Sequence, residues 1–307
     1  MDRPALVAFA QDSISRGSKS FRFASRLFDR TTRERVWLLY AWCRKCDDMA
    51  DGQDHGGAME AVTDPQARLQ AIRELTAMAL AGTPTGEPAF DCLGVVAREC
   101  GLTQRMAEDV IEGFALDAAD WHPRRENDLY QYCYHVAGAV GVMMAVVMGV
   151  SADDDATLDR ACDLGLAFQL ANIARDIAED DAAGRCYLPD DWLATLDIGP
   201  GEHMKPHNRK KLALAGSWLA DEAEKYEASA RVGAKHLPLR ARWAVLSAAG
   251  IYGEIARKVR AAGAQAWDQR IFTSRPEKFR WVRKAFVDAV INNPRDMDRD
   301  ALWTRTR

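Results

Sequence analysis

The segment QLANIARDIAEDDAAGRCYLP, residues 169–189, combines the apolar periodicity of a helix with a row of polar side chains. Asn172, Asp176 and Asp180 follow one another at intervals of four residues, which places them on one face of that helix. Like charges at this spacing destabilise a helix by roughly a few tenths of a kcal/mol. Taken alone, this acidic face is either a solvated helix surface or part of a ligand site.

The segment LYAWCRKCDDMAD, residues 39–51, carries a second acidic face of the same kind. Asp47 and Asp51 are four residues apart, and Asp48 lies beside them. Acidic pairs at this spacing are common on solvated helices, so one motif alone would not distinguish a surface from a site. Two such motifs in one chain favour a site.

Each motif also has a basic neighbour at helical spacing, Arg44 before Asp48 and Arg175 before Glu179. Mg²⁺ prefers oxygen ligands and binds through one or two carboxylates together with substrate phosphates. Two opposed acidic faces could hold several Mg²⁺ around one diphosphate, and the arginines could donate to its oxygens while a C–O bond breaks. The motifs therefore predict metal-assisted chemistry on a diphosphate.

Helical periodicity dominates the rest of the chain, and no alternating strand pattern appears. Met106, Val110 and Phe114, for example, fall at i, i+4 and i+8, with Thr103 as the expected N-cap. Gly and Pro residues mark the breaks between helical segments. The predicted helices cover residues 4–15, 33–51, 66–81, 87–100, 104–118, 128–149, 155–181, 207–233, 239–262 and 276–291.

We expect one domain over residues 1–307, with its core at about 12–291, because no linker, repeat or low-complexity tract divides the sequence. Ten helices and no sheet predict an all-α bundle with its site in the middle. The sequence beyond Asn293 offers no usable pattern.

The composition, 48% apolar and 28% charged, is that of a globular protein with a substantial core. The longest apolar run, residues 136–150, is shorter than the ~20 residues of a membrane span, and no signal peptide begins the chain. These features predict a cytoplasmic protein and leave contact with a membrane surface open. The seven cysteines suggest no disulfide framework, and Cys43 and Cys46 are expected to face the core.

The charges are unevenly distributed along the chain. Residues 16–45 hold nine basic and two acidic residues, residues 47–54 hold four aspartates and no base, and residues 270–307 hold ten basic and five acidic residues. No zinc-finger or stacking-aromatic module accompanies the basic segments, so we expect no nucleic acid partner. HExxH, GxSxG and strand-linked GxGxxG motifs are also absent. A small polyanionic substrate that is held partly by metal ions would explain why the chain has both basic and acidic segments.

Five stretches carry a family resemblance: GSKSF (17–21), LYAWCRKCDDMAD (39–51), YCYHVAGAVG (132–141), QLANIARDIAEDDAAGRCYLP (169–189) and AWDQR (266–270). They resemble, in the same order, the bacterial phytoene synthases of the squalene and phytoene synthase family. The resemblance runs from about Asp12 to Arg280. It implies an all-helical fold of the class I isoprenoid synthase type with a central cavity.

Residue by residue, the resemblance implies two sets of metal ligands and a substrate shell. The metal ligands would be Asp47, Asp48, Asp51, Asn172, Asp176 and Asp180. The positions that match substrate contacts are Ser18, Ser20, Phe21, Tyr40, Arg44, Gln169, Asn172, Arg175, Tyr187 and Arg270. The positions that match catalytic residues are Tyr132, Tyr252, Asp48 and Asp176. Ala171 departs from the polar residue that many relatives carry there.

The implied reaction joins two geranylgeranyl diphosphates head to head, through prephytoene diphosphate, to phytoene in carotenoid biosynthesis. It implies Mg²⁺, with Mn²⁺ as a substitute, no NADPH, and contact with other carotenoid-pathway enzymes. One alternative is a C15-using dehydrosqualene or squalene-type synthase. Another is a non-catalytic assembly or lipid-binding relative, against which the complete acidic motifs weigh.

Two further features each have two interpretations. Gly138, Gly141, Ala145 and Gly149 form a stripe of small residues that either lets another helix approach closely or leaves room for a prenyl chain beside Val142 and Met144. The glycine-rich segment 52–57 is either a mobile flap over the site or an exposed turn.

Overall fold

The protein is seen here as a computed structural model that describes residues 1–17, 19–51, 64–119, 121–291 and 297–306, without the side chains of Lys19, Ser20 and Asp51. No strand occurs in this described part, so the predicted all-α fold is confirmed. The α-helices are α1 (Arg3–Gly17), α2 (Lys19–Ser25), α3 (Arg30–Asp51), α4 (Pro65–Leu80), α5 (Pro88–Cys100), α6 (Gln104–Ala118), α7 (Glu126–Cys133), α8 (Ala139–Val147), α9 (Asp155–Ala182), α10 (Asp190–Thr195), α11 (Arg209–Gly233), α12 (Leu239–Ala262) and α13 (Arg275–Val290).

Each predicted helix is present, and its ends lie within three residues of the prediction. The short helices α2 and α10 were not predicted. The segment predicted as one helix over 128–149 is interrupted by a π-helical turn, η1 (Tyr134–Gly138), between α7 and α8. Three short 3₁₀ turns flank α11 and α12: η2 (Pro206–Asn208), η3 (Ala234–His236) and η4 (Gly263–Gln265).

Side-chain caps fix several helix starts. The Thr103 hydroxyl accepts a hydrogen bond from the Met106 backbone N–H at 3.3 Å, as predicted for the start of α6. Ser274 and Glu277 form a capping box at the start of α13. These contacts satisfy backbone donors that the first helical turn leaves without partners.

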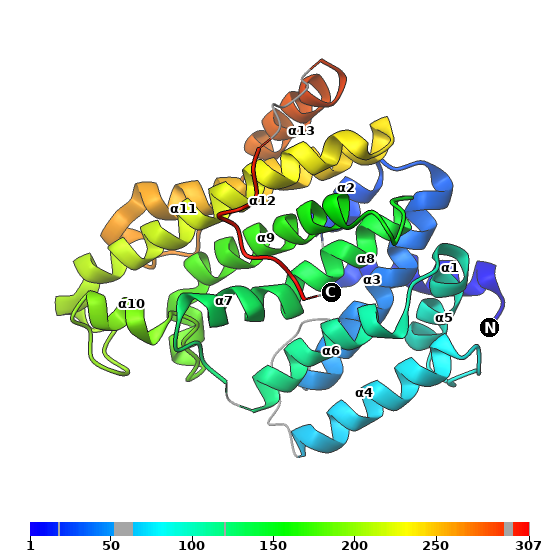
Figure 1. The fold of residues 1–307 in the computed structure, drawn as a ribbon, viewed down its shortest axis with the longest axis horizontal. Helices are drawn as coiled ribbons and strands as arrows, with labels where there is room; N and C mark the ends of the chain where they lie inside the picture. Colours follow the sequence, from blue (N-terminus) through cyan, green and yellow to red (C-terminus); the bar gives the residue numbers. More distant parts are fainter. Residues whose placement is uncertain (18, 52–63, 120, 292–296, 307) are drawn as a thin grey trace.

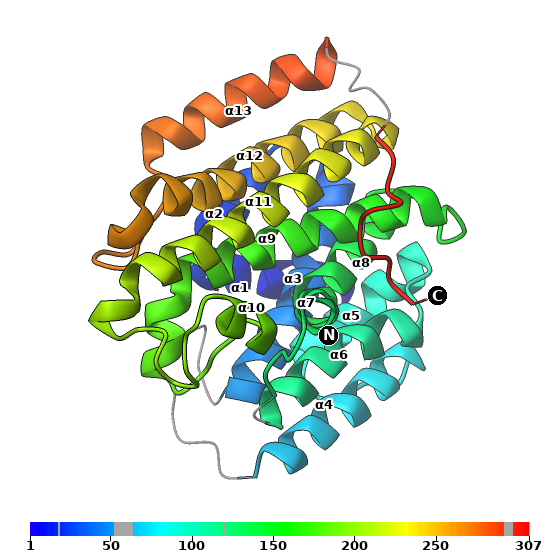
Figure 2. The same cartoon turned by 60° about the vertical axis from the view of Figure 1, so that its left-hand side comes forward.

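The bundle has two halves. α3 packs against α1, α4 and α5, while α9 packs against α11, α12 and α7. The continuous segment formed by η1 and α8 contacts α3, α6 and α9, and so joins the halves. In both views α9 runs through the middle, with α13 at one edge and α4 at the opposite edge (Figures 1 and 2). The two acidic motifs, at the end of α3 and in the second half of α9, therefore belong to different halves.

The segment η1–α8 approaches α9 very closely. A Cβ on Gly141 would lie 2.5 Å from the carbonyl oxygen of Ala161, and a Cβ on Gly165 would collide with the backbone of Ala137. Glycine is needed at both crossings because any larger residue would force the helices apart. This crossing fixes the distance between the halves of the bundle.

Residues 297–306, here called the C-terminal strap, lie across α9 and α11 (Figures 1 and 2). Arg299 forms a bidentate ion pair with the fully buried carboxylate of Asp163, at 2.7 and 2.8 Å. Arg305 donates to Asp159 at 2.9 Å and to Asp155 at 2.6 Å. The strap therefore neutralises three aspartates of α9.

Among the described residues, no helix is both long enough and apolar enough to cross a membrane. All seven cysteines are free thiols. Cys46 is completely buried, as predicted, while Cys43 is partly buried, and burial raises the pKa of the Cys43 thiol to about 12. The pair therefore remains as unreactive thiols.

Candidate active site

The first acidic motif lies at the end of α3, beside an arginine from the preceding turn. Arg44 donates to Asp47 at 2.6 Å and lies 3.6 Å from Asp48, whose carboxylate is largely buried. The side chain of Asp51, the third predicted ligand here, is outside the described part of the structure. α3 thus presents two carboxylates and a guanidinium on one face, as its spacing predicts.

The second acidic motif lies on α9 and is held by two arginines. Arg175 donates to both carboxylate oxygens of Asp176, from its Nε at 2.7 Å and from one terminal nitrogen. Arg270, which follows α12 in the chain, lies 2.9 Å from Asp176 and 3.2 Å from Glu179. The structure therefore brings Arg270 to the neighbouring residues Arg175 and Asp176, which lie far from it in the sequence and which the family resemblance assigns to the same site.

Asp180 lies in a strongly negative environment. Burial, followed by the charges of Asp176, Glu179 and Asp117, raises the pKa of its carboxyl to about 7, and only Arg185 acts in the opposite sense. A divalent cation would relieve this repulsion, and oxygen ligands are those that Mg²⁺ prefers. The donor set fits a metal, although no three acidic, His or Cys side chains among the described residues already converge on one point.

Asp117, at the end of α6, is a site residue that the sequence analysis missed. Its Oδ1 accepts hydrogen bonds from the hydroxyls of Tyr132 at 3.0 Å and Tyr187 at 3.1 Å. The Tyr132 ring is stacked between Trp121 and Tyr187, with centroid distances of 5.3 and 4.8 Å. Burial and the Asp117 charge raise the pKa of Tyr132 well above its usual value, so its hydroxyl keeps its proton.

A pocket of about 200 Å³ connects Asp117 to the first acidic motif. Its polar wall is formed by Tyr40, Arg44, Asp47 and Asp117. Within the described chain, the buried hydroxyl of Tyr40 and the buried Nε of Arg44 have no hydrogen-bond partner. Unpaired buried donors are costly, so this pocket is suited to an anionic ligand that accepts from both.

A larger, mainly apolar cavity of about 360 Å³ lies between α2, α8, α9 and α12. Four of the predicted site residues line it: Phe21, Gln169, Asn172 and Tyr252. Tyr252 stacks on Phe168 at 4.4 Å, and Phe21 stacks on Tyr40 of the smaller pocket at 5.6 Å. The cavity therefore has a polar end on α9, one helical turn before Asp176.

The two cavities share a wall. Val136 of η1 and Val140 of α8 line both of them. The same segment that joins the two halves of the bundle thus separates an apolar chamber from a pocket with unpaired donors. The arrangement thus offers two adjoining spaces, one lined by Asn172 of the second acidic motif and the other by Asp47 of the first.

The stripe of small residues partly lines the large cavity and partly allows the close packing of helices. Gly141 and Ala145 line the large cavity, together with Met144, and Gly141 also allows the close approach of α9. Gly138 packs against Cys162 and Leu166 of α9. Gly149 lies beyond α8 in a turn, with a φ of +100° that favours glycine.

Some predicted residues lie outside the described part of the structure. They are Ser18, the side chain of Ser20, and the segment 52–57 that was considered as a flap.

Comparisons with known proteins place the chain among characterised sequences and folds. The model of the squalene/phytoene synthase family matches residues 14–277. A phytoene synthase from Pseudescherichia vulneris is 47% identical, covering 93% of this chain and 92% of that protein. A 15-cis-phytoene synthase from Pantoea ananas is 46% identical, covering 96% of each chain. A crystal structure of a dehydrosqualene synthase has a TM-score of 0.81 at 26% identity, covering 92% of this chain and 96% of that one.

Proposed function

This chain belongs to the squalene/phytoene synthase family, and we propose that it condenses two molecules of geranylgeranyl diphosphate into phytoene in carotenoid biosynthesis. One observation carries the proposal. The apolar cavity, lined by Gln169 and Asn172 at its polar end, shares a wall with a second pocket that contains Arg44 and Asp47. Two chambers, each beside an acidic motif, suit a reaction between two long-chain diphosphates.

We propose that the two acidic motifs hold divalent metal ions, Mg²⁺ first and Mn²⁺ as a substitute. The ligands would be Asp47, Asp48 and Asp51 on α3, and Asn172, Asp176 and Asp180 on α9. When bound, the ions neutralise the charge of a leaving diphosphate and so favour cleavage of its C–O bond. The family acts on prenyl diphosphates with divalent metals, in agreement with the donor set.

The arginines and Tyr40 are proposed to bind diphosphate oxygens. The Nε of Arg44 and the hydroxyl of Tyr40 are buried close to each other, and neither has a hydrogen-bond partner of good geometry in the described residues, so an oxygen of a diphosphate could accept from both. Arg175 and Arg270 already share Asp176, and they can turn toward a second diphosphate at the same helix face. Ser18, Ser20, Phe21, Gln169 and Tyr187 are proposed to complete the substrate shell.

The reaction has two halves. In the first, one diphosphate leaves, C1 of that molecule bonds to C2 and C3 of the other, and a proton is lost, which gives prephytoene diphosphate. In the second, the remaining diphosphate leaves, the carbon skeleton rearranges, and another proton is lost to give phytoene.

The protein must keep water from the carbocations of both steps, and the apolar lining of the cavity does so. Tyr132 and Tyr252 are proposed to stabilise these cations through their ring faces. The hydrogen bond to Asp117 holds the Tyr132 ring in place for this role.

The test is direct. The purified chain is incubated with Mg²⁺ and with C15 or C20 diphosphates, with and without NADPH, and the hydrocarbon is identified. Phytoene from the C20 substrate is the expected product. If only the C15 substrate gave a product, the chain would be a dehydrosqualene-type synthase. The similarity to a dehydrosqualene synthase structure is the reason for testing this alternative. If no product formed under any condition, the remaining interpretation would be that the chain is a non-catalytic relative.

The substrate and product also imply a place of action. We propose a cytoplasmic protein, a single isoprenoid synthase domain, that touches a membrane peripherally and contacts other carotenoid-pathway enzymes. A C40 hydrocarbon has no polar group, and water disfavours every exposed methylene. A product of this kind must pass directly into an apolar phase or into another protein.

A further inference from the structure

Exposed apolar side chains are concentrated on and around α13. Ten large apolar residues are exposed in the described part of the chain, and six of them fall between residues 272 and 291: Phe272, Phe279, Phe286, Val287, Val290 and Ile291. Their exposed fractions run from 45% to 73%. Single exposed apolar residues are normal on a protein surface, but such a concentration marks an interaction surface.

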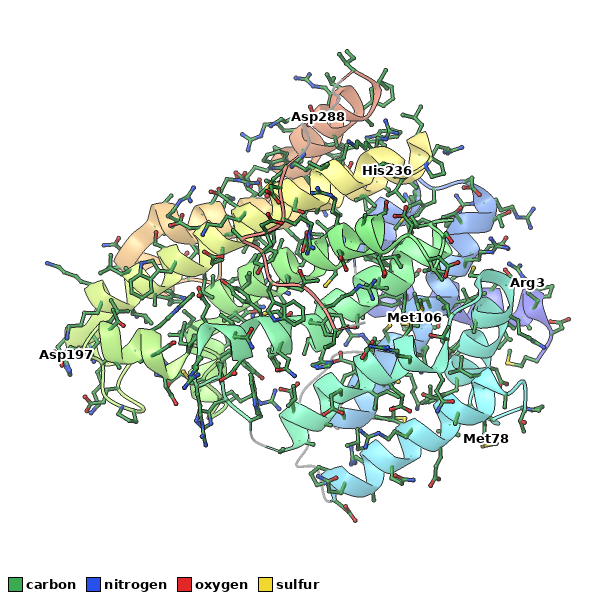
Figure 3. The ribbon with its side chains drawn as sticks, viewed as in Figure 1. Arg3, Met78, Met106, Asp197, His236 and Asp288 are labelled. Carbon is green, nitrogen blue, oxygen red and sulfur yellow. The ribbon has the colours of Figure 1, made fainter. Side chains whose placement is uncertain are left out.

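The opposite face of α13 holds it to the bundle. Ala285 and Ala289 are buried, and the indole N–H of Trp281 donates to Glu254 of α12 at 3.1 Å. The guanidinium of Arg257 also lies over the Trp281 ring, at 4.9 Å from its centroid. α13 packs on α12 at the edge of the molecule, where Asp288 is labelled, far from Met78 on α4 (Figures 1–3). The exposed apolar residues of α13 lie outside this buried face. Phe279 and Phe286 each touch the bundle with one ring edge, against Phe23 and Trp243, and still remain 63% and 46% exposed.

Basic residues border this apolar face. α13 contains five basic and two acidic residues, whereas the whole chain has a net charge of −4. Arg275 and Arg283 are exposed, and neither forms an ion pair within the described part of the chain. Arg280 and Arg283 also line a shallow surface groove of about 650 Å³ together with Phe279 and Phe286. An apolar stripe flanked by free arginines complements an anionic membrane surface.

The same face adjoins the walls of the large cavity. Phe279 packs edge-on against Phe23 of α2, with 6.0 Å between the ring centroids. Phe21 and Ala24 of α2 line the cavity. Ala248 of α12, the helix on which α13 packs, lines it as well. A surface held against α13 would therefore lie next to two of the helices that enclose the cavity.

We propose that the outer face of α13, formed by Arg275, Phe279, Arg283, Phe286, Val287 and Val290, docks the protein on an anionic lipid bilayer. The proposal rests on the proposed function, whose apolar substrate tails and product need a membrane beside the cavity. The apolar side chains enter the headgroup–acyl boundary, and the arginines bind lipid phosphates. The docked face places α2 and α12 at the membrane, which gives the prenyl chains a short path between bilayer and cavity.

The test is vesicle flotation of the full chain with phosphatidylcholine vesicles, with or without phosphatidylglycerol. Arg275→Glu/Arg283→Glu removes no ion pair of the described structure, and the glutamate at position 275 is favourable because this position begins α13. Each basic residue near an anionic leaflet contributes about fivefold to partitioning. We expect the double variant to bind anionic vesicles at least 25-fold more weakly. Phe279→Ser/Val290→Ser should weaken binding to both vesicle types.

Two matched variants serve as controls. Arg98→Glu/Lys210→Glu reverses two exposed basic residues on α5 and α11, and Leu214→Ser removes an apolar residue of α11 that is 52% exposed. Both should bind vesicles as the unchanged chain does. Melting curves show whether each variant is folded.

Activity separates this proposal from the proposed function. With substrate dispersed in detergent, the α13 variants should form hydrocarbon at the unchanged rate, and with substrate in anionic vesicles they should lose most of their activity. If the unchanged chain makes no hydrocarbon in detergent, the proposed function fails, whatever the flotation result. If folded Arg275→Glu/Arg283→Glu floats with anionic vesicles as well as the unchanged chain does, the docking proposal is overturned. It is also overturned if the face instead forms a dimer, detected by sedimentation velocity and abolished by Phe279→Ser/Val290→Ser, without vesicle binding.

Discussion

The ring of Tyr132 stacks on the ring of Tyr187 with 4.8 Å between their centroids and 21° between their planes. Both hydroxyls donate to the same oxygen of Asp117. Three separate segments thus meet at one carboxylate: α6, α7, and the loop after α9. A shared acceptor couples the two tyrosines energetically as well as geometrically.

We expect Asp117→Ala to lower the free energy of unfolding by about 2–5 kcal/mol, because it leaves two buried hydroxyls without an acceptor. It should also lower kcat, since Tyr132 loses the contact that orients its ring. A double-mutant cycle measures the coupling. Tyr132→Phe should cost about 1.5–3 kcal/mol in the unchanged chain. In the Asp117→Ala background, Tyr132→Phe should cost almost nothing. If the free-energy costs of Asp117→Ala and Tyr132→Phe were instead additive, Tyr132 would be held in place by its ring contacts alone.

Asp48→Asn and Asp176→Asn should each reduce turnover by orders of magnitude while the helical fold is kept. Each removes a charge from an acidic face proposed to hold metal. Asp48→Asn should leave the melting temperature nearly unchanged or slightly raised, because it relieves local repulsion. Asp176→Asn should lower stability by about 1 kcal/mol, because Asp176 pairs with Arg175 and Arg270. Steady-state kinetics and circular dichroism provide the measurements.

The matched control is Asp153→Asn, which changes an exposed aspartate whose side chain makes no contact within the described structure. It should be fully active. Near-normal turnover in both site variants would remove the metal-site assignment.

Ala145→Phe should discriminate against C20 substrate far more than against C15 substrate. Ala145 is 2% exposed and lines the large cavity beside Met144 and Met148, so a phenyl ring would shorten that cavity. At about 0.8 kcal/mol per buried methylene, loss of contacts to the last isoprene unit costs several kcal/mol of binding. The measurement is the ratio of kcat/KM for the two chain lengths. A large drop in melting temperature with an unchanged ratio would mean that the side chain overpacks the core instead.

Hydrocarbon should form without NADPH. The sequence contains no dinucleotide-binding turn, and the proposed final step loses a proton, whereas a reductive ending would need hydride. The assay compares product yield and identity with and without the nucleotide. Strict dependence on NADPH, with a fully reduced product, would assign the chain to squalene-type synthesis.

The attachment of α13 should weaken in acid. Hydrogen bonds from Lys258 and Ser274 lower the pKa of Glu277 from 4.5 to about 2. A lowered folded-state pKa means that the stabilisation is complete above pH 4.5 and is lost as the pH falls toward 2. Because Glu277 lies near the surface, we expect its ionised carboxylate to stabilise the folded protein by only about 1 kcal/mol. The free energy of unfolding of Glu277→Gln should be lower than that of the unchanged chain at pH 6, and the difference should shrink below pH 4.5 and close only as the pH approaches 2. Glu74→Gln, on the exposed side of α4, should show no such convergence.

Much of the fold was predictable because its helices are long and their ends carry explicit signals. Thr103 and the Gly and Pro breaks placed helix ends within a few residues. The turn Tyr134–Gly138 was not predictable, since a single π-helical turn leaves the apolar pattern of the segment almost unchanged. α2 and α10 are too short to show a period.

The site was predictable where its residues lie on one helix, and not where distant segments combine. Asp176 and Asp180 follow helical spacing, so the sequence identified them. Asp117 is one acidic residue at the end of an amphipathic helix, and its role arises only when Tyr132 and Tyr187 reach it from elsewhere. Arg299 gave no signal at all, because its partner, Asp163, lies far earlier in the sequence and looks like any other polar residue of α9.

The strap also has a consequence for the order in which the protein can mature. Asp155, Asp159 and Asp163 belong to the helix that bears the second acidic motif, yet Arg299 and Arg305, which neutralise them, are synthesised after all thirteen helices. A buried carboxylate that lacks its partner costs several kcal/mol. The contacts of α9 with the strap can therefore form only after the strap has been translated, and we expect α9 to reach its full stability only then. Premature termination within these few residues would yield a chain that contains every proposed site residue and lacks the ion pairs that Arg299 and Arg305 form with α9.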